Sequence, residues 1–174
     1  RALMRALLRH ALPLVVLAAA ACTQRPFDPQ AQIETLRILA VHMDHSTPAP
    51  GTDVKLEMLA FDGSPHAMLP DGTPRPVEYA WLGGCFDPNG DLYYKCYPGL
   101  ASTLDDFDAG KASPWIGHGT SYTLHVAEDV VSRRPASSGS ARYGLSFVFY
   151  AACAGKIVTV RGSEATTPPL SCVD

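Results

Sequence analysis

The chain has 174 residues, of which 47% are hydrophobic and 18% are charged, and its formal net charge is −3. This length predicts one domain of about 100–150 residues. Residues 1–21 hold three arginines and no acidic residue, so the rest of the chain has 11 basic and 17 acidic side chains, a formal charge of −6. This acidic balance argues against a nucleic-acid-binding protein and against a polybasic surface that grips anionic lipid.

The N-terminal segment has the layout of a secretory signal peptide. Arg5 and Arg9 come first, an apolar run of 11 residues extends from Ala11 to Ala21, and small residues lead directly to Cys22. A membrane-spanning helix needs roughly 20 apolar residues, so this run is too short to span a bilayer. We therefore expect residues 1–21 to be a signal peptide.

The residues before Cys22 resemble the cleavage site of bacterial lipoproteins. In that family the cysteine usually follows Leu, a small residue and Gly or Ala; here Ala19 stands where Leu is commonest. The resemblance implies that Cys22 receives a diacylglyceryl thioether, becomes the new N-terminus and is then N-acylated, for example with palmitate. It places the protein in the bacterial cell envelope, lipid-anchored to a membrane and most naturally to the outer membrane. The alternative is an ordinary secreted protein cut near Ala19–Ala21, in which Cys22 has no role.

The rest of the chain predicts short strands separated by turns. Residues 22–32 are polar and contain two prolines, so we expect a tether. Residues 53–61 place Val54, Leu56 and Met58 on one face and charged residues on the other, which is typical of a half-buried antiparallel strand. Residues 143–153 are apolar on both faces, which predicts a central strand. Further strands are expected at 33–43, 77–82, 120–126 and 156–161.

Residues 83–119 have no sustained hydrophobic period and are predicted to form a long irregular insert. Asn89-Gly90 is a strong turn signal, so we expect a short hairpin around residues 88–91. No helix is expected here or elsewhere in the domain. Residues 163–174 are expected to form a tail, which could begin a further C-terminal region.

Short strands without helices predict an all-β, antiparallel sandwich. Two stretches resemble bacterial immunoglobulin-like or PKD-like domains: the turn and strand Gly51-Thr52-Asp53-Val54-Lys55-Leu56, and the strand Tyr79-Ala80-Trp81. The whole layout is also similar to lipoproteins of high-GC Gram-negative bacteria. The resemblance implies an immunoglobulin-like sandwich over residues 33–162, interrupted by a long disulfide-containing insert.

Four cysteines follow Cys22, namely Cys85, Cys96, Cys153 and Cys172. An even number in an oxidising compartment predicts two disulfides, for which three pairings are possible. In the sandwich that the resemblance implies, the strands ending at Cys85 and Cys153 run antiparallel side by side. These two cysteines would then lie at opposite ends, beyond the roughly 7 Å Cα separation that a disulfide permits. The resemblance therefore favours Cys85–Cys96 and Cys153–Cys172.

Two clusters could bind a metal ion. Asp87, Asn89 and Asp91 match the first half of a calcium loop, but Leu92 and Pro98 occupy the positions where an EF-hand requires Gly and Glu. A looser calcium site would need help from the acidic residues at 105–108, and the simpler interpretation is a solvated turn. The cluster His42, Asp44 and His45 lacks a third ligand on the same strand face. We expect no metal and no other cofactor.

No Gly-x-Ser-x-Gly motif marks a catalytic serine, and we expect no catalysis. Aromatic residues gather in the insert, and we expect Tyr93, Tyr94, Tyr97 and Trp115 to form a binding surface for a glycan or an envelope protein. They could instead form a small core beneath the insert. The sequence thus predicts a lipid-anchored binding or spacer module. The alternative is an accessory domain of a glycan-directed or metal-assisted hydrolase that uses the insert at 85–115.

Overall fold

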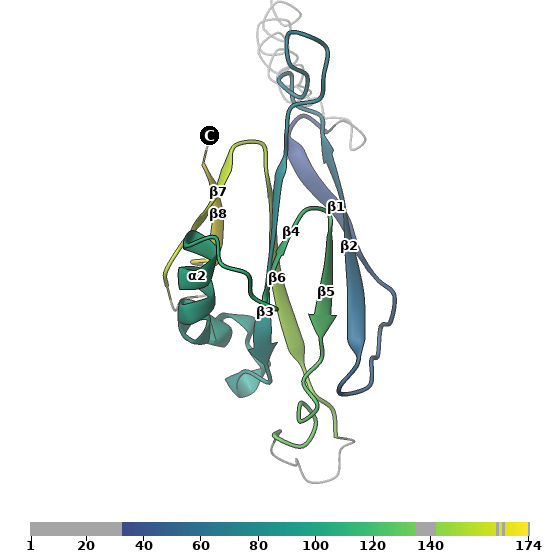
Figure 1. The fold of residues 1–174 in the computed structure, drawn as a ribbon, viewed down its shortest axis with the longest axis vertical. Coiled ribbons are helices and arrows are strands. Elements are labelled where there is room, and N and C mark those ends of the chain that lie inside the picture. Colours follow the sequence, from purple (N-terminus) through teal and green to yellow (C-terminus); the bar gives the residue numbers. More distant parts are fainter. Residues whose placement is uncertain (1–32, 135–141, 163, 165, 174) are drawn as a thin grey trace, which may run out of the picture. The chain divides into compact units, whose positions relative to one another are not determined.

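The computed structural model describes residues 33–134, 142–162, 164 and 166–173, which belong to one unit, Ile33–Asp174 (Figure 1). The predicted signal peptide, the lipidation site Cys22 and most of the predicted tether, residues 22–32, lie outside the described residues. Within the described part of the chain, no helix is both long enough and apolar enough to cross a membrane.

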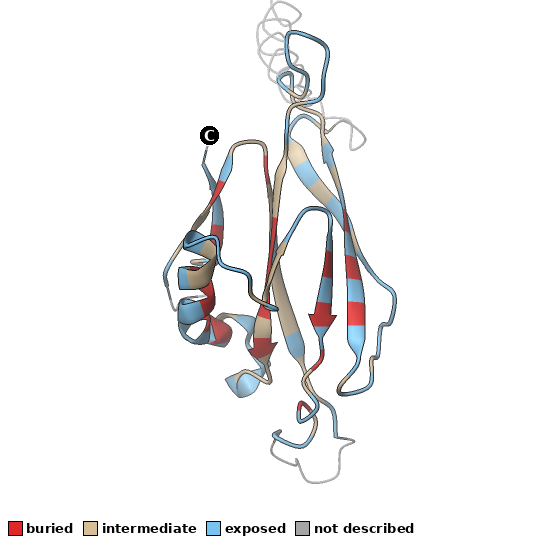
Figure 2. Cartoon of the chain, in the orientation of Figure 1, coloured by how far each residue is buried: buried red, intermediate tan, exposed pale blue. Residues whose placement is uncertain are grey.

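The first sheet contains β1 (Leu36–Met43), β2 (Asp53–Asp62) and β5 (Ser121–His125), arranged antiparallel in the order β1-β2-β5. Val54, Leu56 and Met58 are buried while the charged residues between them are exposed. Figure 2 shows this as alternating buried and exposed bands along β2 and β5. The period-2 prediction for this strand is confirmed.

The second sheet contains β3 (Glu78–Phe86), β4 (Ile116–His118) and β6 (Ser146–Cys153), in the antiparallel order β4-β3-β6. Strand β3 is central and carries a bulge between Leu82 and Cys85. Gly84 lies in this bulge with φ +85°, a conformation that favours glycine. The prediction of an all-β fold built from antiparallel strands is confirmed at this level.

The two sheets share one hydrophobic core. Its buried residues come from β2, β3, β5 and the segment after β5; they are Val54, Leu56, Met58, Trp81, Tyr122, Leu124, Val126 and Val130. Trp81 is fully buried there, and its indole N–H donates to the Gly119 carbonyl at 2.8 Å. Burial of the indole therefore leaves no unpaired donor.

A third layer covers the opposite face of β3. After the turn η1 (Asn89–Asp91), this layer contains η2 (Tyr93–Leu100), α2 (Ala101–Asp108) and an antiparallel pair of strands, β7 (Lys156–Thr159) and β8 (Leu170–Val173). This layer encloses a second core with β3 and β6; its buried residues are Ala80, Leu82, Tyr97, Leu100, Leu104, Cys153, Ile157 and Leu170. Figure 1 shows α2, β7 and β8 on one side of β3, with β1, β2 and β5 on the other.

Three expectations about this layer were wrong. Residues 89–91 form a 3-10 turn instead of a hairpin, 101–108 form an α-helix, and the expected tail contains β8. Helix α2 forms because Leu100, Leu104 and Phe107 recur at helical spacing and pack on the second core. The helix ends at Asp108, and Gly110 follows with a φ of +63°; there Gly110 N–H donates to Phe107 O and Lys111 N–H donates to Asp106 O.

The prediction that residues 143–153 form a central strand was also wrong. Among the described residues β6 pairs only with β3, so β6 is an edge strand. Its two apolar faces have another cause: Val148 and Ala152 pack against the first core, whereas Phe149 and Ala151 pack against the second. A strand between two cores needs apolar residues on both faces even at the edge of its sheet.

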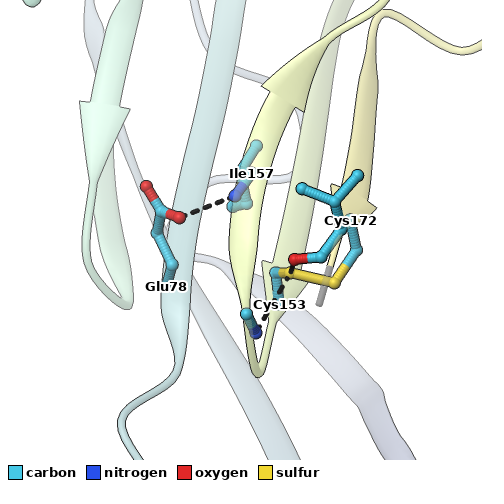
Figure 3. The surroundings of a disulfide bond; sticks show 6 residues. Glu78, Cys153, Ile157 and Cys172 are labelled. Carbon is cyan, nitrogen blue, oxygen red and sulfur yellow. Dashed lines mark hydrogen bonds between the residues drawn. A yellow bond between two sulfur atoms is a disulfide. The ribbon is translucent and has the colours of Figure 1, made fainter.

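The structure contains the two expected disulfides, Cys85–Cys96 and Cys153–Cys172, with Cα separations of 5.7 and 5.4 Å. Strands β3 and β6 hold Cys85 and Cys153 apart, because Cys153 pairs with Glu78 at one end of the two strands while Cys85 lies near the other end, where Phe86 pairs with Ser146. The first disulfide links β3 to η2, and the second links β6 to β8. Beside the second, Glu78 Oε2 accepts a hydrogen bond from Ile157 N–H at 2.6 Å (Figure 3).

Candidate functional site

The proposed calcium ligands Asp87 and Asp91 lie in the turn after β3, and an arginine bridges them. The Arg134 guanidinium is 2.6 Å from Asp91 Oδ2 and 3.5 Å from Asp87 Oδ1. Its hydrogen bond holds the pKa of the Asp91 carboxyl below its usual value. Asn89, the third proposed ligand, is exposed. The guanidinium thus supplies the positive charge that a cation would have brought to these carboxylates.

No group of three or more His, Cys, Asp or Glu residues in the described part of the chain has an arrangement suited to a metal ion. At the end of β1, His45 Nδ1 lies 3.1 Å from Asp44 Oδ1, which also accepts a hydrogen bond from Lys55 N–H at 3.0 Å. His42 is exposed on the same strand. The Asp44 carboxylate therefore stabilises the connection between β1 and β2.

The four aromatic residues predicted to form a binding surface are in different environments. Tyr97 is 5% exposed in the second core, where its ring centroid lies 5.4 Å from that of Phe149. Trp115 and Tyr94 are half-buried, and only Tyr93, at 44%, is exposed. Tyr97 therefore belongs to a core beneath the insert, and the four residues do not share one exposed surface.

A cavity of about 610 Å³ lies on the side where β1 and β6 face one another. We call it the edge cleft. The residues that characterise it are Val41, Met43, Val131, Leu145, Val148 and Tyr150. Trp81 and Leu124 contribute from the first core, so the cleft opens directly onto the hydrophobic interior.

The edge cleft is open because neither strand beside it has a second neighbour. Strands β1 and β6 are each at the end of their sheet in the described residues. Apolar side chains consequently reach the surface along the opening: Met43 is 48% exposed and Tyr150 is 45% exposed. Exposed apolar side chains grouped along a concave surface are typical of a binding site.

This cleft was not predicted from the sequence. Its lining comes from segments between residues 41 and 150 that meet only when the two sheets pack together. The available signal is the uncharged stretch from Tyr143 to Gly155, most of which lies in the strand expected at residues 143–153.

No family model, no curated protein and no solved structure matches this chain.

Proposed function

We propose that this protein is a bacterial lipoprotein, anchored in the cell envelope through lipid on Cys22, and that its domain is a non-catalytic binding module. The observation that carries the binding role is the edge cleft, an apolar cavity of about 610 Å³ beside two free sheet edges. The lipid anchor is supported by the signal-like segment and the small residues before Cys22.

The composition of the cleft favours binding over chemistry. His45, Tyr143 and Tyr150 are the titratable residues of its lining, and the remainder are apolar or small neutral residues. Ligand sites are typically concave and mostly apolar, with volumes of roughly 300–1,000 Å³. The edge cleft fits this description, whereas general acid–base catalysis requires titratable groups placed within hydrogen-bonding reach of one another.

We further propose that the domain is an immunoglobulin-like sandwich. The sheet β1-β2-β5 corresponds to strands A, B and E of that fold, and β3 and β6 correspond to C and F. In this correspondence no described strand occupies the position of strand G beside β6. The layer of α2, β7 and β8 is an addition on the outer face of the second sheet.

Metabolic labelling with an alkyne analogue of palmitate tests the anchor. The full chain is expressed in a Gram-negative host, and we expect label on the wild-type protein and none on Cys22→Ser. Label that persisted on the Cys22→Ser variant would contradict the anchor at this residue.

Fluorescence titration with the uncharged apolar dye Nile red tests the cleft separately. We expect saturable binding to the purified full chain, and at least tenfold weaker binding to Val148→Trp, because the larger ring occupies the cleft. Tyr93→Trp is the matched control, since it adds an indole at an exposed position on the insert. Equal dye binding by the wild type and the Val148→Trp variant would contradict a binding role for the cleft.

A further inference from the structure

We propose that the edge cleft binds an extended, uncharged segment of a partner polypeptide, which adds to β6 as a new edge strand and inserts alternate apolar side chains into the cleft. This inference rests on the binding role proposed above and specifies the ligand. Addition of a strand to a free sheet edge is a general mode of peptide recognition, in which main-chain hydrogen bonds provide affinity and side-chain pockets provide selectivity.

The backbone of β6 presents free hydrogen-bonding groups to such a ligand. Asp87 N–H donates to Leu145 O at 2.9 Å, so Leu145 points its backbone toward β3. Along an antiparallel strand, successive residues direct their backbone N–H and C=O groups alternately toward and away from the neighbouring strand. The extra residue of the bulge lies in β3, so this alternation continues without interruption along β6. Ser146, Val148 and Tyr150 therefore direct their N–H and C=O groups away from β3, where no described strand pairs with them.

The same three residues border the cleft, together with apolar side chains from β1. An added strand would place every second side chain over the cleft, because successive side chains point to opposite faces of a strand. The backbone of the added strand would form hydrogen bonds with the unpaired N–H and C=O groups of β6, and its apolar side chains would cover the opening of the first core. A small apolar ligand or an acyl chain could fill the cleft but would leave the β6 backbone unpaired.

The near absence of charged side chains around the cleft indicates which kind of peptide would bind as the added strand. No charged residue occurs from Tyr143 to Gly155, and among the described residues that line the cleft His45 is the one basic residue. A charged side chain inserted here would lose its hydration without gaining a partner. The lining therefore matches an uncharged apolar strand.

The charge pattern also favours β6 over β1 as the acceptor edge. Strand β1 carries Arg37 and His42 and has a register shift between Ile38 and Ala40. Charges and bulges are features that make a sheet edge a poor template for pairing. Strand β6 has neither.

A second copy of this chain does not fit the cleft equally well. The β6 strand of a second copy already packs Val148 against its own first core and Phe149 against its own second core. It could pair edge to edge, but it could not also insert these side chains into a neighbouring cleft. The ligand must be a segment whose apolar face is free.

The test uses a set of fluorescent synthetic peptides eight residues long, the length of β6, with blocked ends. They alternate Thr with Val, Leu, Ile or Phe, and binding to the purified full chain is followed by fluorescence anisotropy. The best binder is then made in two N-methylated forms, each lacking the amide hydrogens along one edge. We expect at least one form to bind about tenfold more weakly or worse, because several main-chain hydrogen bonds to β6 are lost.

The protein is varied at the exposed edge residue Ser146. Ser146→Pro removes an outward N–H that makes no bond to β3, and we expect peptide binding about tenfold weaker. Ser146→Ala keeps this N–H and should bind as the wild type does. Peptide binding should also slow hydrogen exchange at the amides of Val148 and Tyr150. Exchange at Phe147 and Phe149 should change little, because their amides already face β3.

The outcomes separate the two proposals. If the dye binds in the cleft but no peptide of the set binds, or both N-methylated forms bind as well as the parent, strand addition is wrong and the cleft remains a binding site. If Val148→Trp leaves dye binding unchanged, the proposed binding role itself is wrong. Weakening by N-methylation and by Ser146→Pro together supports strand addition.

Discussion

Asp87 and Leu145 are joined by two hydrogen bonds: Asp87 N–H donates to Leu145 O at 2.9 Å, and Leu145 N–H donates to Asp87 Oδ1 at 2.8 Å. A side-chain oxygen here takes the place of the backbone carbonyl that would continue the ladder between β3 and β6. The Asp87 side chain is only 7% exposed, so its carboxylate is part of the structure rather than a free surface ligand. This pair fixes the beginning of β6, which is also the beginning of the proposed peptide-binding edge.

Asp87→Ala is expected to lower the free energy of unfolding by about 1–3 kcal/mol, because it leaves the half-buried Leu145 N–H without an acceptor. Asp87→Asn keeps an oxygen in that position and should cost less. Urea titration of both variants measures the difference. Equal losses would contradict the hydrogen bond as the cause and would point to the charge facing Arg134 instead.

Local patterns predicted much of this fold from sequence. The alternation of Val54, Leu56 and Met58 identified β2, because a strand with one buried face must repeat every two residues. The disulfide pairing that the structure contains was implied by the resemblance to an immunoglobulin-like sandwich, in which the strands ending at Cys85 and Cys153 place these two cysteines too far apart for a disulfide.

Features that depend on a third layer were not predictable in the same way. Strand β6 has apolar residues on both faces. A central strand shows this pattern, and so does an edge strand that lies between two cores, so the sequence alone does not distinguish the two positions. The helical spacing of Leu100, Leu104 and Phe107 was a usable signal for α2, but it is short and is interrupted by acidic residues. The edge cleft exists only because two sheets meet, so no local pattern encodes it.

The Cys153–Cys172 disulfide closes a segment with a sequence separation of 19 and holds β8 against β6. Replacing both cysteines with alanine should lower the free energy of unfolding by about 2–5 kcal/mol, as is common for small secreted domains. Hydrogen exchange should accelerate first in β7 and β8. The matched pair Cys85→Ala and Cys96→Ala should instead loosen η2. Faster exchange in the same element for both pairs would contradict this assignment.

Glu78 and Ile157 connect the second sheet to the third layer through the 2.6 Å hydrogen bond from the Ile157 amide to Oε2 (Figure 3). Glu78→Ala should lower the free energy of unfolding by about 1–3 kcal/mol, because the amide of the buried residue Ile157 loses its acceptor. Glu78→Gln retains an oxygen acceptor and should lose about half as much. Chemical denaturation measures both. No loss in Glu78→Ala would mean that water replaces the carboxylate.

Gly117 on β4 leaves room for the ring of Tyr122. A Cβ at this position would lie 2.5 Å from Tyr122 Cδ2, so Gly117→Ala must displace the ring or the strand. We expect a loss of about 1–3 kcal/mol in thermal or chemical unfolding, as for other overpacked cores. Gly99→Ala is the control, because nothing lies within 4 Å of its added Cβ. Similar losses at both positions would contradict the steric explanation.

Tyr122 gives the domain an expected sensitivity to alkaline pH. Its side chain is 6% exposed, its hydroxyl donates to Pro114 O at 2.8 Å, and burial raises its pKa from 10.0 to about 12. The folded state therefore keeps a proton that the unfolded state releases from pH 10 upward. This contribution to stability is fully present below pH 10 and is lost as the pH rises toward 12.

The size of this contribution is about 2–3 kcal/mol, since each pKa unit corresponds to about 1.4 kcal/mol. Tyr122→Phe should be less stable than the wild type by about 1 kcal/mol at neutral pH, because Pro114 O loses its donor. Its stability should fall less steeply between pH 10 and 12, so the two curves approach one another and then cross, with Tyr122→Phe the more stable protein near pH 12. Urea unfolding across this range tests the slope, with Tyr93→Phe as the exposed control. Parallel curves for the wild type and Tyr122→Phe would show that Tyr122 ionises in the folded state as readily as in the unfolded chain.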